Sequence, residues 1–329
     1  MLKFMEVVPP GTNIDFIGKW KICVCISSAI ILISLIAALP QVRGIKLGLD
    51  FAGGVEMVVR FPAGMTADEG MIRSAVGSVG AKDPAVVRFS EGDAQDFLVR
   101  FQTESTGEKG ELVDAIRDAL TQQVGKVEIQ RVDFVGPRVG KELRQDGLLA
   151  VGISCLFILI YIAFRFSTRF APGAVIALFH DIVITAGVFV VLGREFDLTV
   201  LAALLAILGY SLNDTIIVYD RIRENMAVHT KHELAALLNL SVNQTLSRTL
   251  LTSGATMLAV LALLFLGGEV IRPFAMAMVI GIFVGTYSSI YIAAPTLLLL
   301  EERYGKEKSK KPAPSAKSGA KGGPKAARA

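Results

Sequence analysis

The sequence predicts a polytopic α-helical membrane protein with six transmembrane helices and an external α+β domain between the first and second helices. Of its 329 residues, 52% are hydrophobic and only 19% are charged, and the mean hydropathy is +0.54. Soluble domains carry about 25% charged residues, whereas apolar residues here gather in runs long enough to cross a bilayer core of roughly 30 Å. All three cysteines lie inside these runs. The composition therefore excludes a soluble enzyme, a disordered chain and a secreted disulfide scaffold.

Six apolar runs divide the chain into spans, loops and two ends. The first run, 22–39, follows a cytoplasmic head at 1–21 and is long enough to span, so we expect it to be retained rather than cleaved as a signal peptide. Residues 40–147 are predicted to form the external domain, 148–300 the remaining spans, and 301–329 a disordered basic cytoplasmic tail. The later apolar runs lie at 148–164, 171–193, 198–219, 249–268 and 273–300.

The distribution of Lys and Arg orients these spans. With the N-terminus in the cytoplasm, the inner segments together hold 18 basic residues, and the two short outer loops hold only Arg194 and Arg272. Short cytoplasmic loops carry an excess of Lys and Arg, so both ends are predicted to be cytoplasmic and the domain at 40–147 external. The basic tail can contact anionic lipid or RNA, but a topology anchor is the simpler interpretation, and no nucleic-acid partner is predicted.

The external segment has the order βαββαβ, which is the split, ferredoxin-like arrangement. Alternation of apolar residues predicts a first strand at 55–61, with Val55, Met57, Val59 and Phe61 on one face. A fold of this kind implies no activity by itself. The further predicted strands lie at 85–90, 97–102 and 127–134, with a turn near Gly92 and Asp93.

Two helices are predicted between these strands. Thr66 with Glu69 opens the first, and Ser105 with Glu108 opens the second, because both pairs have the spacing of a capping box. The second helix places apolar side chains on one face, which we expect to pack against the sheet. Those side chains are Val113, Ile116 and Leu120.

Two carboxylates lie inside the apolar runs, where a lipid-facing helix tolerates none. Asp181 follows His180 in the third span, and Asp214 lies in the fourth among Gly, Ser and Asn. An ionised group near the bilayer centre costs about 2.5–3.5 kcal/mol, and such residues face a bundle interior and mark ion pathways. Arg248, at the start of the fifth span, is the nearest basic group, and protonation along such a track would alter a charge pair. The supporting polar side chains are His180, Ser211, Asn213, Thr215, Thr249 and Thr252, followed by Ser253.

Structural interpretations of the same residues stay open. The two acids can be protonated and hold helices together by hydrogen bonds worth about 0.6 kcal/mol on average. Arg248 can be an anchor that snorkels to the interface, and Ser211 and Asn213 can be packing groups. Gly281 and Gly285 form a small-xxx-small pair, typical of helix packing. His229 and His232 have a spacing that would let both bind one metal ion. A solvated loop is favoured because no further ligand supports them.

Covalent chemistry is not indicated by the sequence. It contains no phosphate-binding Gly-Lys-Ser/Thr loop and no arrangement that suggests a Ser-His-Asp triad. An ion gradient is the energy source that remains for a membrane carboxylate, since one proton crossing the membrane potential releases about 2.3 kcal/mol per 100 mV. The residues alone therefore predict an ion-coupled membrane machine with an external working domain, without enzyme activity, metal or other cofactor.

Several motifs resemble those of the SecF family of bacterial protein-export subunits. Residues 48–54 (GLDFAGG) are similar to its signature after the first span, although Ala52 stands where a hydroxyl residue is common. Residues 135–143 are similar to its segment re-entering the membrane, and the resemblance covers about residues 10–300. The motif residues are Gly48, Asp50, Gly53, Gly54, Gly136 and Pro137, and the span motifs are His180-Asp181, 209–225 (GYSLNDTIIVYDRIREN) and 243–249.

This resemblance implies a partner and a mechanism. SecF proteins pair with SecD as two halves that resemble an RND-type transporter, associate with the SecYEG channel and often with YidC, and lie in the bacterial inner membrane. The pair uses the proton-motive force to promote translocation of unfolded preproteins after the SecA-driven step. By motif position, Asp214 is the proton-carrying carboxylate, Arg248 its charged partner and Asp181 a supporting acid, with a further carboxylate supplied by SecD.

Three other functions remain open from the sequence. The chain can be an RND-like exporter of lipids or small molecules, or a non-catalytic assembly subunit that stabilises the translocon and conducts no ions. Coupling to sodium is the third, because a carboxylate among Ser, Thr and Asn oxygens can serve either ion. The neutral substitution Asp214→Asn separates the assembly role from the ion-coupled one.

Overall fold

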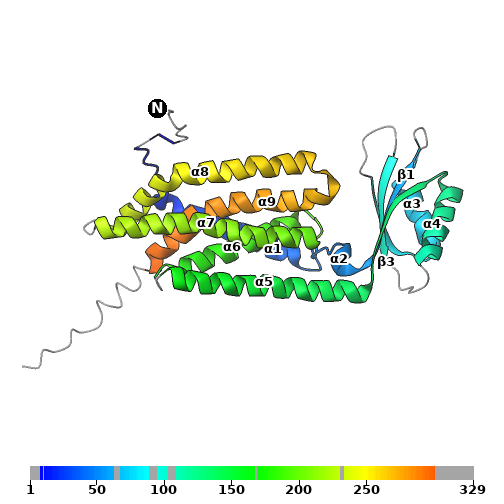
Figure 1. Ribbon diagram of the computed structural model, residues 1–329, viewed down its shortest axis with the longest axis horizontal. Coiled ribbons are helices and arrows are strands. Elements are labelled where there is room, and N and C mark those ends of the chain that lie inside the picture. The colour runs from blue at the N-terminus through cyan, green and yellow to red at the C-terminus, as the bar shows by residue number, and fades with distance from the viewer. Residues whose placement is uncertain are drawn as a thin grey trace, which may run out of the picture.

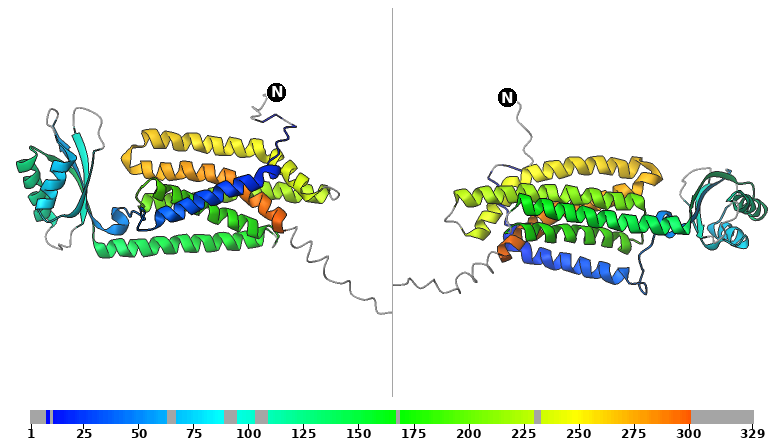
Figure 2. Two further views of the ribbon diagram at one scale, coloured as in Figure 1. Left: turned by 180° about the vertical axis from the view of Figure 1, so that it is seen from behind. Right: turned by 60° about the horizontal axis from the view of Figure 1, so that its bottom comes forward.

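A bundle of long helices carries a small α+β domain at one end (Figure 1). The computed structural model describes residues 8–9, 11–62, 67–88, 95–102, 109–166, 169–229 and 233–300. The start of the first long helix and the end of the last one both lie at the end of the bundle opposite the α+β domain (Figures 1 and 2). This arrangement confirms the predicted fold class.

Within the described residues, six helices are long and apolar enough to cross a membrane, as predicted. The first continues a short 3-10 turn, and the last continues through a π-helical segment to residue 300. They are α1 (Trp20–Ala38) after η1 (Ile17–Lys19), α5 (Pro137–Arg165), α6 (Ala171–Val191), α7 (Leu198–Val228), α8 (Leu234–Leu266), and α9 (Gly268–Ser288) followed by η2 (Ser289–Ala293).

Several helices extend beyond the predicted spans. Helix α5 begins at Pro137, with Gly136 as its N-cap, although the apolar run begins only at residue 148. Helices α7 and α8 together take up most of the predicted inner loop 220–248. An apolar run marks only the part of a helix that lipid surrounds, and polar turns such as the one with the Arg221–Glu224 ion pair (2.6 Å) continue it into water.

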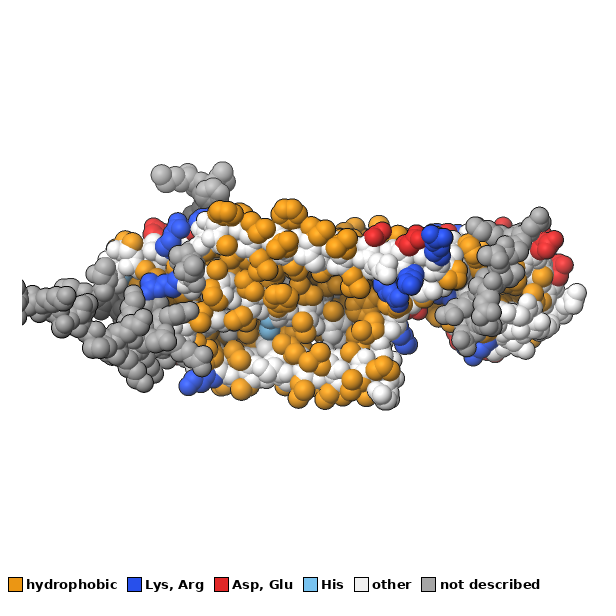
Figure 3. All heavy atoms as spheres, turned by 90° about the horizontal axis from the view of Figure 1, so that it is seen from below, with side chains coloured by type: hydrophobic (Ala, Val, Ile, Leu, Met, Phe, Trp, Pro, Cys, Tyr) orange, Lys and Arg blue, Asp and Glu red, His pale blue; other side chains and the backbone are white. Residues whose placement is uncertain are grey.

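The bundle has an inner and an outer set of helices. Helices α6, α7 and α9 bury the most of their surface, and α1, α5 and α8 bury the least. Apolar side chains cover the middle of the bundle, and Lys and Arg side chains gather toward both of its ends (Figure 3). Phe164 is 89% exposed and Leu266 is 86% exposed, as expected for side chains that face lipid.

The predicted glycine pair brings α9 against α7. A Cβ atom at Gly285 would lie 2.9 Å from the Cβ of Ser211, and one at Gly281 would lie 2.3 Å from the side chain of Ile207. Neither position can carry a side chain without displacing its neighbour, so the two glycines allow the helices to approach closely. The packing role predicted for Gly281 and Gly285 is therefore confirmed.

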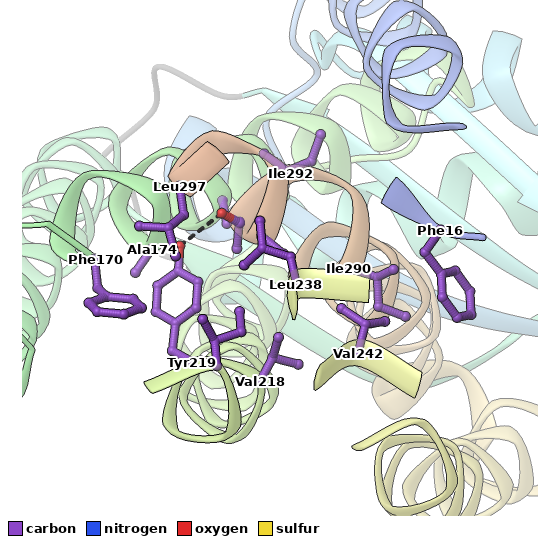
Figure 4. Close-up of a cluster of buried hydrophobic side chains, with 14 of the residues drawn as sticks. Phe16, Phe170, Ala174, Val218, Tyr219, Leu238, Val242, Ile290, Ile292 and Leu297 are labelled. Carbon is purple, nitrogen blue, oxygen red and sulfur yellow. Dashed lines mark hydrogen bonds between the residues drawn. The ribbon is translucent and has the colours of Figure 1, made fainter. Parts of the chain in front are cut away.

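A fully buried tyrosine ties α7 to the π-helical segment η2. The Tyr219 hydroxyl donates a hydrogen bond to the carbonyl oxygen of Ala293 at 2.9 Å (Figure 4). A Cβ at Gly173 would lie 2.2 Å from that hydroxyl oxygen, so α6 leaves room for it. Phe166 and Phe170 make edge contacts with the Tyr219 ring at centroid distances of 5.6 Å and 5.3 Å. The hydroxyl thus satisfies a carbonyl in a segment whose regular α-helical pattern is interrupted.

The α+β domain contains one four-stranded antiparallel sheet with the strand order β2-β3-β1-β4. This confirms the predicted βαββαβ arrangement. A one-turn helix, α2 (Leu49–Ala52), precedes the sheet and was not predicted. The other elements are β1 (Gly54–Phe61), α3 (Glu69–Ser78), β2 (Lys82–Arg88), β3 (Gln95–Gln102), α4 (Lys109–Gln123) and β4 (Glu128–Val135).

The core of this domain lies between the sheet and its two helices. The predicted inward face of β1 is buried, and so is the apolar face of α4. Helix α3 begins at Glu69 after an Asp68 N-cap, whose carboxylate accepts from the Gly70 amide at 2.9 Å. The predicted helix start, with Thr66 as cap and Glu69 three residues later, is therefore wrong. The helix begins at Glu69 itself, because Asp68 is a favourable cap. The predicted caps Thr66, Ser105 and Glu108 and the turn at Gly92 and Asp93 lie outside the described residues.

The other face of the sheet is turned toward the bundle. Helices α3 and α4 lie on the far side of the sheet from the membrane helices (Figures 1 and 2). Among the described residues, the face toward the bundle carries three ion pairs, Arg60–Asp96 at 2.6 Å, Arg100–Glu56, and Arg131–Asp133 at 2.5 Å. The hydrogen bond from Arg60 lowers the pKa of the Asp96 carboxyl. The sheet therefore presents fixed charge to the membrane helices.

Candidate functional site

Asp181 lies in the middle of α6 and is surrounded by hydrogen-bond donors. Its side chain is 1% exposed and bonds with His180 Nδ1 at 2.8 Å and with Ser288 Oγ at 2.8 Å. The Ser211 hydroxyl of α7 donates to the same carboxylate. Three donors from three helices are what an ionised carboxylate needs in place of water. Asp181 is thus well solvated by the protein itself.

His180 extends this cluster toward the first span. Its Nδ1 is shared with Asp181, whereas Nε2 is buried with no hydrogen-bond partner among the described residues. The imidazole stacks on the ring of Tyr287, with centroids 6.2 Å apart. The Tyr287 hydroxyl donates to the Cys23 carbonyl at 2.6 Å and accepts from Ser27 at 3.1 Å. The cluster around Asp181 therefore connects α6, α7, α9 and α1.

Asp214 lies one helical turn from Ser211 on α7 but in a poorer environment. Its side chain is also 1% exposed, and the Ser253 hydroxyl of α8 donates a hydrogen bond to it at 3.2 Å. The Thr286 hydroxyl of α9 contacts Ser253 at 2.8 Å and also acts on Asp214. These hydroxyl groups compensate less of the charge of an ionised acid than the three close partners of Asp181 do.

Arg248, the predicted charged partner of Asp214, acts on it from a distance. It is exposed on α8, and within the described part of the chain no ion pair joins it to Asp214. It lies close enough for its charge to act on Asp214 without contact. The reason is geometric: Ser253 occupies the side of α8 that faces Asp214, and Arg248 points away from the bundle interior.

The other predicted polar residues divide into buried and exposed groups. Thr249 is buried, and its hydroxyl has no hydrogen-bond partner among the described residues. Thr252 bonds to carbonyl groups of its own helix, at 3.0 Å to Arg248 and 3.1 Å to Thr249, so it does not join the track. Thr215 is buried, whereas Asn213 is exposed on the outward face of α7.

Two residues of α9 complete the site and were not predicted. Ser288 binds Asp181, and Thr286, two positions earlier, reaches Asp214 through Ser253. Hydroxyl residues are common in membrane helices and carry no charge, so they did not stand out in an apolar run. The signal that could have identified them is their position one and three residues after Gly285, the glycine that brings α9 against Ser211.

A metal site is not supported by the described residues. They contain no group of three or more His, Cys, Asp and Glu side chains that could hold an ion. The solvated loop predicted around His229 and His232 falls partly outside the described residues, which do not include His232. The chemistry available to the bundle is proton or ion binding by a carboxylate, with hydroxyl groups as ligands.

Residues 115–303 match the family described as protein export membrane protein SecD/SecF, C-terminal, and residues 42–61 match the SecD/SecF GG motif. The chain belongs to the SecD/SecF family. A protein translocase subunit SecF from Calditerrivibrio nitroreducens is 42% identical over 92% of this chain and 98% of its own length. The SecF from Magnetococcus marinus is 45% identical over 90% of this chain and 95% of its own length.

A solved structure supports the same assignment. The crystal structure of SecDF from Thermus, a translocon-associated membrane protein, superposes with a TM-score of 0.77 and 35% sequence identity. The match covers 89% of this chain but only 39% of that chain, so this SecD/SecF protein spans about two fifths of the length of the SecDF polypeptide. It is a multi-pass membrane protein of a protein-export family.

In this SecD/SecF protein the GG motif forms the joint between the domain and the bundle. Gly53 and Gly54 have φ values of 74° and 134°, which only glycine adopts readily. A Cβ at Gly53 would lie 2.9 Å from the Cα of Pro137, and one at Gly54 would lie 2.7 Å from the carbonyl oxygen of Phe101. The motif glycines therefore fold α2 tightly between β1, β3 and the start of α5.

Gly48 and Asp50 attach the same joint to α7. The Gly48 amide donates to the Phe196 carbonyl at 2.7 Å, and the Asp50 carboxylate accepts from the Leu198 amide at 3.0 Å. Leu198 is the first residue of α7, so Asp50 satisfies one of the free amide groups at that helix terminus. The motif residues thus have a structural role that the sequence did not reveal.

Proposed function

We propose that this protein works with SecD as a proton-driven subunit of the Sec export machinery, promoting translocation of preproteins across the bacterial inner membrane after the SecA-driven step. The observation that carries the proposal is Asp214, a carboxylate 1% exposed in a membrane bundle and bonded to the Ser253 hydroxyl at 3.2 Å. An acid in such a place is stable only if it is neutral or if its charge has a use. A proton gradient would protonate and deprotonate Asp214 in turn.

The proposed cycle uses the contacts around Asp214. A proton arriving from outside neutralises Asp214, which weakens its attraction to the exposed Arg248 and changes the demand on the Ser253 hydroxyl. The α7–α8–α9 packing then shifts between two arrangements, and release of the proton to the inside restores the first. A proton can shift such an equilibrium only by its different affinity for the two states. Asp181 supports the cycle by holding α6, α7 and α9 together.

SecD is the partner that the outward face of α7 and α8 favours. Asn213, Arg248 and Thr252 are exposed there, although each carries polar groups. A rise of 1.5 Å per residue puts Arg248 about 27 Å from the outer end of α8, near the inner boundary of the hydrocarbon. Small residues accompany the polar ones, which suits close packing of partner helices. These exposed small residues are Ala202, Ala206 and Gly209 on α7 and Ala255 and Ala259 on α8.

The topology follows from the positive-inside rule and from the shape of the molecule. The described chain ends lie opposite the α+β domain (Figure 1). With 18 basic residues in the inner segments against two in the short outer loops, both ends are proposed to be cytoplasmic and the domain external. In that orientation the domain meets preproteins as they leave the SecYEG channel, with YidC and lipid as further neighbours.

The test is export of a secretory precursor into vesicles that contain this chain and SecD, with and without an imposed proton gradient. We expect Asp214→Asn to abolish the gradient-dependent part of export, while co-purification shows that the complex is intact. The matched control is Asp220→Asn, the same change on the same helix at a half-exposed residue paired with Arg165 at 2.5 Å. The control should keep gradient stimulation.

Two results would redirect the interpretation. Equal gradient stimulation in wild type and Asp214→Asn would refute proton coupling at Asp214 and favour a non-catalytic assembly subunit. Stimulation by a sodium gradient alone, lost in Asp214→Asn, would retain the carboxylate as the coupling group and replace the proton by sodium. An arm with sodium on one side of the vesicle membrane separates the two ions.

A further inference from the structure

We propose that Arg100 and Glu195, together with the Asp50 cap, form the contact through which α7 and the external domain move as one body. The inference rests on the proposed function only in taking Asp214 of α7 as the group whose charge changes. The contact itself lies outside the membrane, at the junction of the sheet with the loop between α6 and α7.

The start of α7 is held by the chain segment that leads into the domain. The Phe196 amide donates to the Lys46 carbonyl at 2.9 Å, and the Gly48 amide donates back to the Phe196 carbonyl at 2.7 Å. The Asp50 carboxylate then accepts from the Leu198 amide at 3.0 Å. Three hydrogen bonds within a few residues fix the position of the helix start relative to α2, which leads directly into β1.

Arg100 adds a side-chain link from the sheet to the same loop. Its guanidinium donates through Nε to Glu56 and through Nη1 to Glu195, so one planar group joins β3, β1 and the loop before α7. Burial lowers the pKa of Arg100, but the two carboxylates outweigh it and raise the pKa overall. Arg100 therefore stays charged, and its fork geometry sets direction as well as distance.

The domain has two covalent connections to the bundle, one from α1 through α2 into β1 and one from β4 through Gly136 into α5. The contact with α7 is a third attachment, beside the first of these connections. Helix α7 runs without a break from Leu198 to Val228, so a shift of the turn that carries Asp214 reaches its outer end. The β4–α5 connection and the contact with α7 hold the domain at different points. A movement of α7 relative to α5 therefore rotates the domain as well as displacing it.

The same sheet face provides a matched control. Arg60 and Asp96 form an ion pair at 2.6 Å between β1 and β3, four residues along β3 from Arg100. This pair is internal to the sheet and makes no described contact with the bundle. Reversal of its charges perturbs the domain to a comparable degree without touching the α7 joint.

The experiment measures the position of the domain in the full chain with SecD in lipid nanodiscs. Spin labels are placed on the exposed Gln122 of α4 and Leu266 at the end of α8, after the three native cysteines are replaced by serine. The distance distribution is compared between the Asp214 parent and Asp214→Asn, which mimics the protonated acid. The comparison is repeated with Arg100→Glu, with Glu195→Arg and with both, and in parallel with Arg60→Glu, Asp96→Arg and both.

We expect Asp214→Asn to shift the distance distribution in the parent. Each single reversal at Arg100 or Glu195 should reduce that shift by about three- to tenfold, since a partly exposed pair is replaced by like charges. The double swap should restore part of the shift, because it re-forms the pair with residue 195 but leaves a carboxylate opposite Glu56, and the control pair should leave the shift unchanged. A shift that persists in Arg100→Glu overturns the proposal, and so does a loss of equal size in the control swap.

The proposed function and this inference fail in different ways. If Asp214→Asn gives no shift in the parent, proton-driven movement at Asp214 is refuted. Amide hydrogen exchange at residues 46–50 and 196–198 then tests whether the Arg100–Glu195 contact links α7 to the domain. Faster exchange in Arg100→Glu than in Arg60→Glu supports the Arg100–Glu195 contact as the link between α7 and the domain, and unchanged exchange overturns it.

Discussion

The two buried carboxylates differ in how completely the protein solvates them. Asp181 has three hydrogen-bond partners on α6, α7 and α9, one of them the ring of His180. Asp214 is buried to the same extent, but it is held by one serine and lies beside an exposed face of α7 and α8. Burial alone therefore does not distinguish a structural acid from one suited to change its charge.

The difference assigns opposite expectations to the two sites. Asp181 is bonded to side chains of three helices, so its loss disturbs the contacts of all three. The hydrogen bond from Ser253 to Asp214 is longer, at 3.2 Å, so a small shift of α8 changes the surroundings of Asp214. We therefore expect Asp181 to matter most for stability and Asp214 to matter most for the response to a gradient.

The largest predicted effect is on stability at Asp181. Asp181→Ala leaves the His180, Ser211 and Ser288 donors without an acceptor, and removing one partner of a buried charged network costs about 3–5 kcal/mol. Asp214→Ala should cost far less, about 1 kcal/mol, because one hydrogen bond is lost. Unfolding of the purified chain in detergent measures both. Equal losses would contradict the contrast between the two acids.

A second prediction concerns α9, the helix whose side chains contact the surroundings of both Asp181 and Asp214. Gly285→Ala places a methyl group 2.9 Å from the Cβ of Ser211, and such overpacking costs about 1–3 kcal/mol. Displacement of α9 should weaken the Ser288 and Thr286 contacts together. Gly152→Ala on α5, where no atom lies within 4 Å of the new methyl group, is the control and should not destabilise. Thermal unfolding midpoints in detergent check the pair, and comparable losses would refute the close approach.

Serine substitutions sharpen the comparison at the level of single hydrogen bonds. Ser253→Ala and Ser211→Ala should each lower stability by about 0.6 kcal/mol, the average for such bonds in a membrane. Only Ser253→Ala should alter gradient-driven export, since it removes the hydrogen bond of Asp214. Export assays in vesicles separate the two variants, and a larger effect from Ser211→Ala would exchange the roles of the two acids.

The smallest effect concerns pH and the external domain. Arg60 lowers the pKa of folded Asp96, so their pair stabilises the fold above the unfolded pKa of about 3.9 and loses that contribution as the pH falls through the lower folded value. Asp96→Asn should therefore lower the unfolding midpoint at pH 7 by about 2 °C or less, and not at all at the acid end. The exposed Asp118→Asn serves as control, and a difference from wild type that persists in acid would contradict the assignment.

Much of the fold was readable because lipid imposes strict rules on a chain. Spans need long apolar runs, and a sheet packed on one side needs alternation, so both the six helices and the β1 face were predicted. The lengths of α5, α7 and α8 were not, because water tolerates polar helical turns that no apolar run marks. Helix α2 was missed because the glycines around Leu49 and Ala52 indicate a turn.

The candidate site was predicted only in its charged members. Asp181 and Asp214 stood out because a charge in an apolar run is costly. Ser288 and Thr286 did not, since pairing across helices depends on helix rotation, which a single sequence does not give. Arg248 was predicted as the charged partner of Asp214, but the sequence did not show that Ser253 is the residue of α8 that bonds to the acid, because packing decides which side of a helix faces a neighbour.

The Asp50–Leu198 hydrogen bond also bears on how the protein is made. The two residues are 148 positions apart, and α5 and α6 lie between them in the chain. In the proposed topology Asp50 lies on the outer side of the membrane, and it can accept from Leu198 only when the loop between α6 and α7 arrives beside it. Asp197 caps α7 locally by accepting from the Val200 amide, whereas the Leu198 amide meets Asp50 only after the α5–α6 hairpin has inserted. The joint closes only on a chain whose first four spans are correctly threaded, which makes it a built-in check on topology.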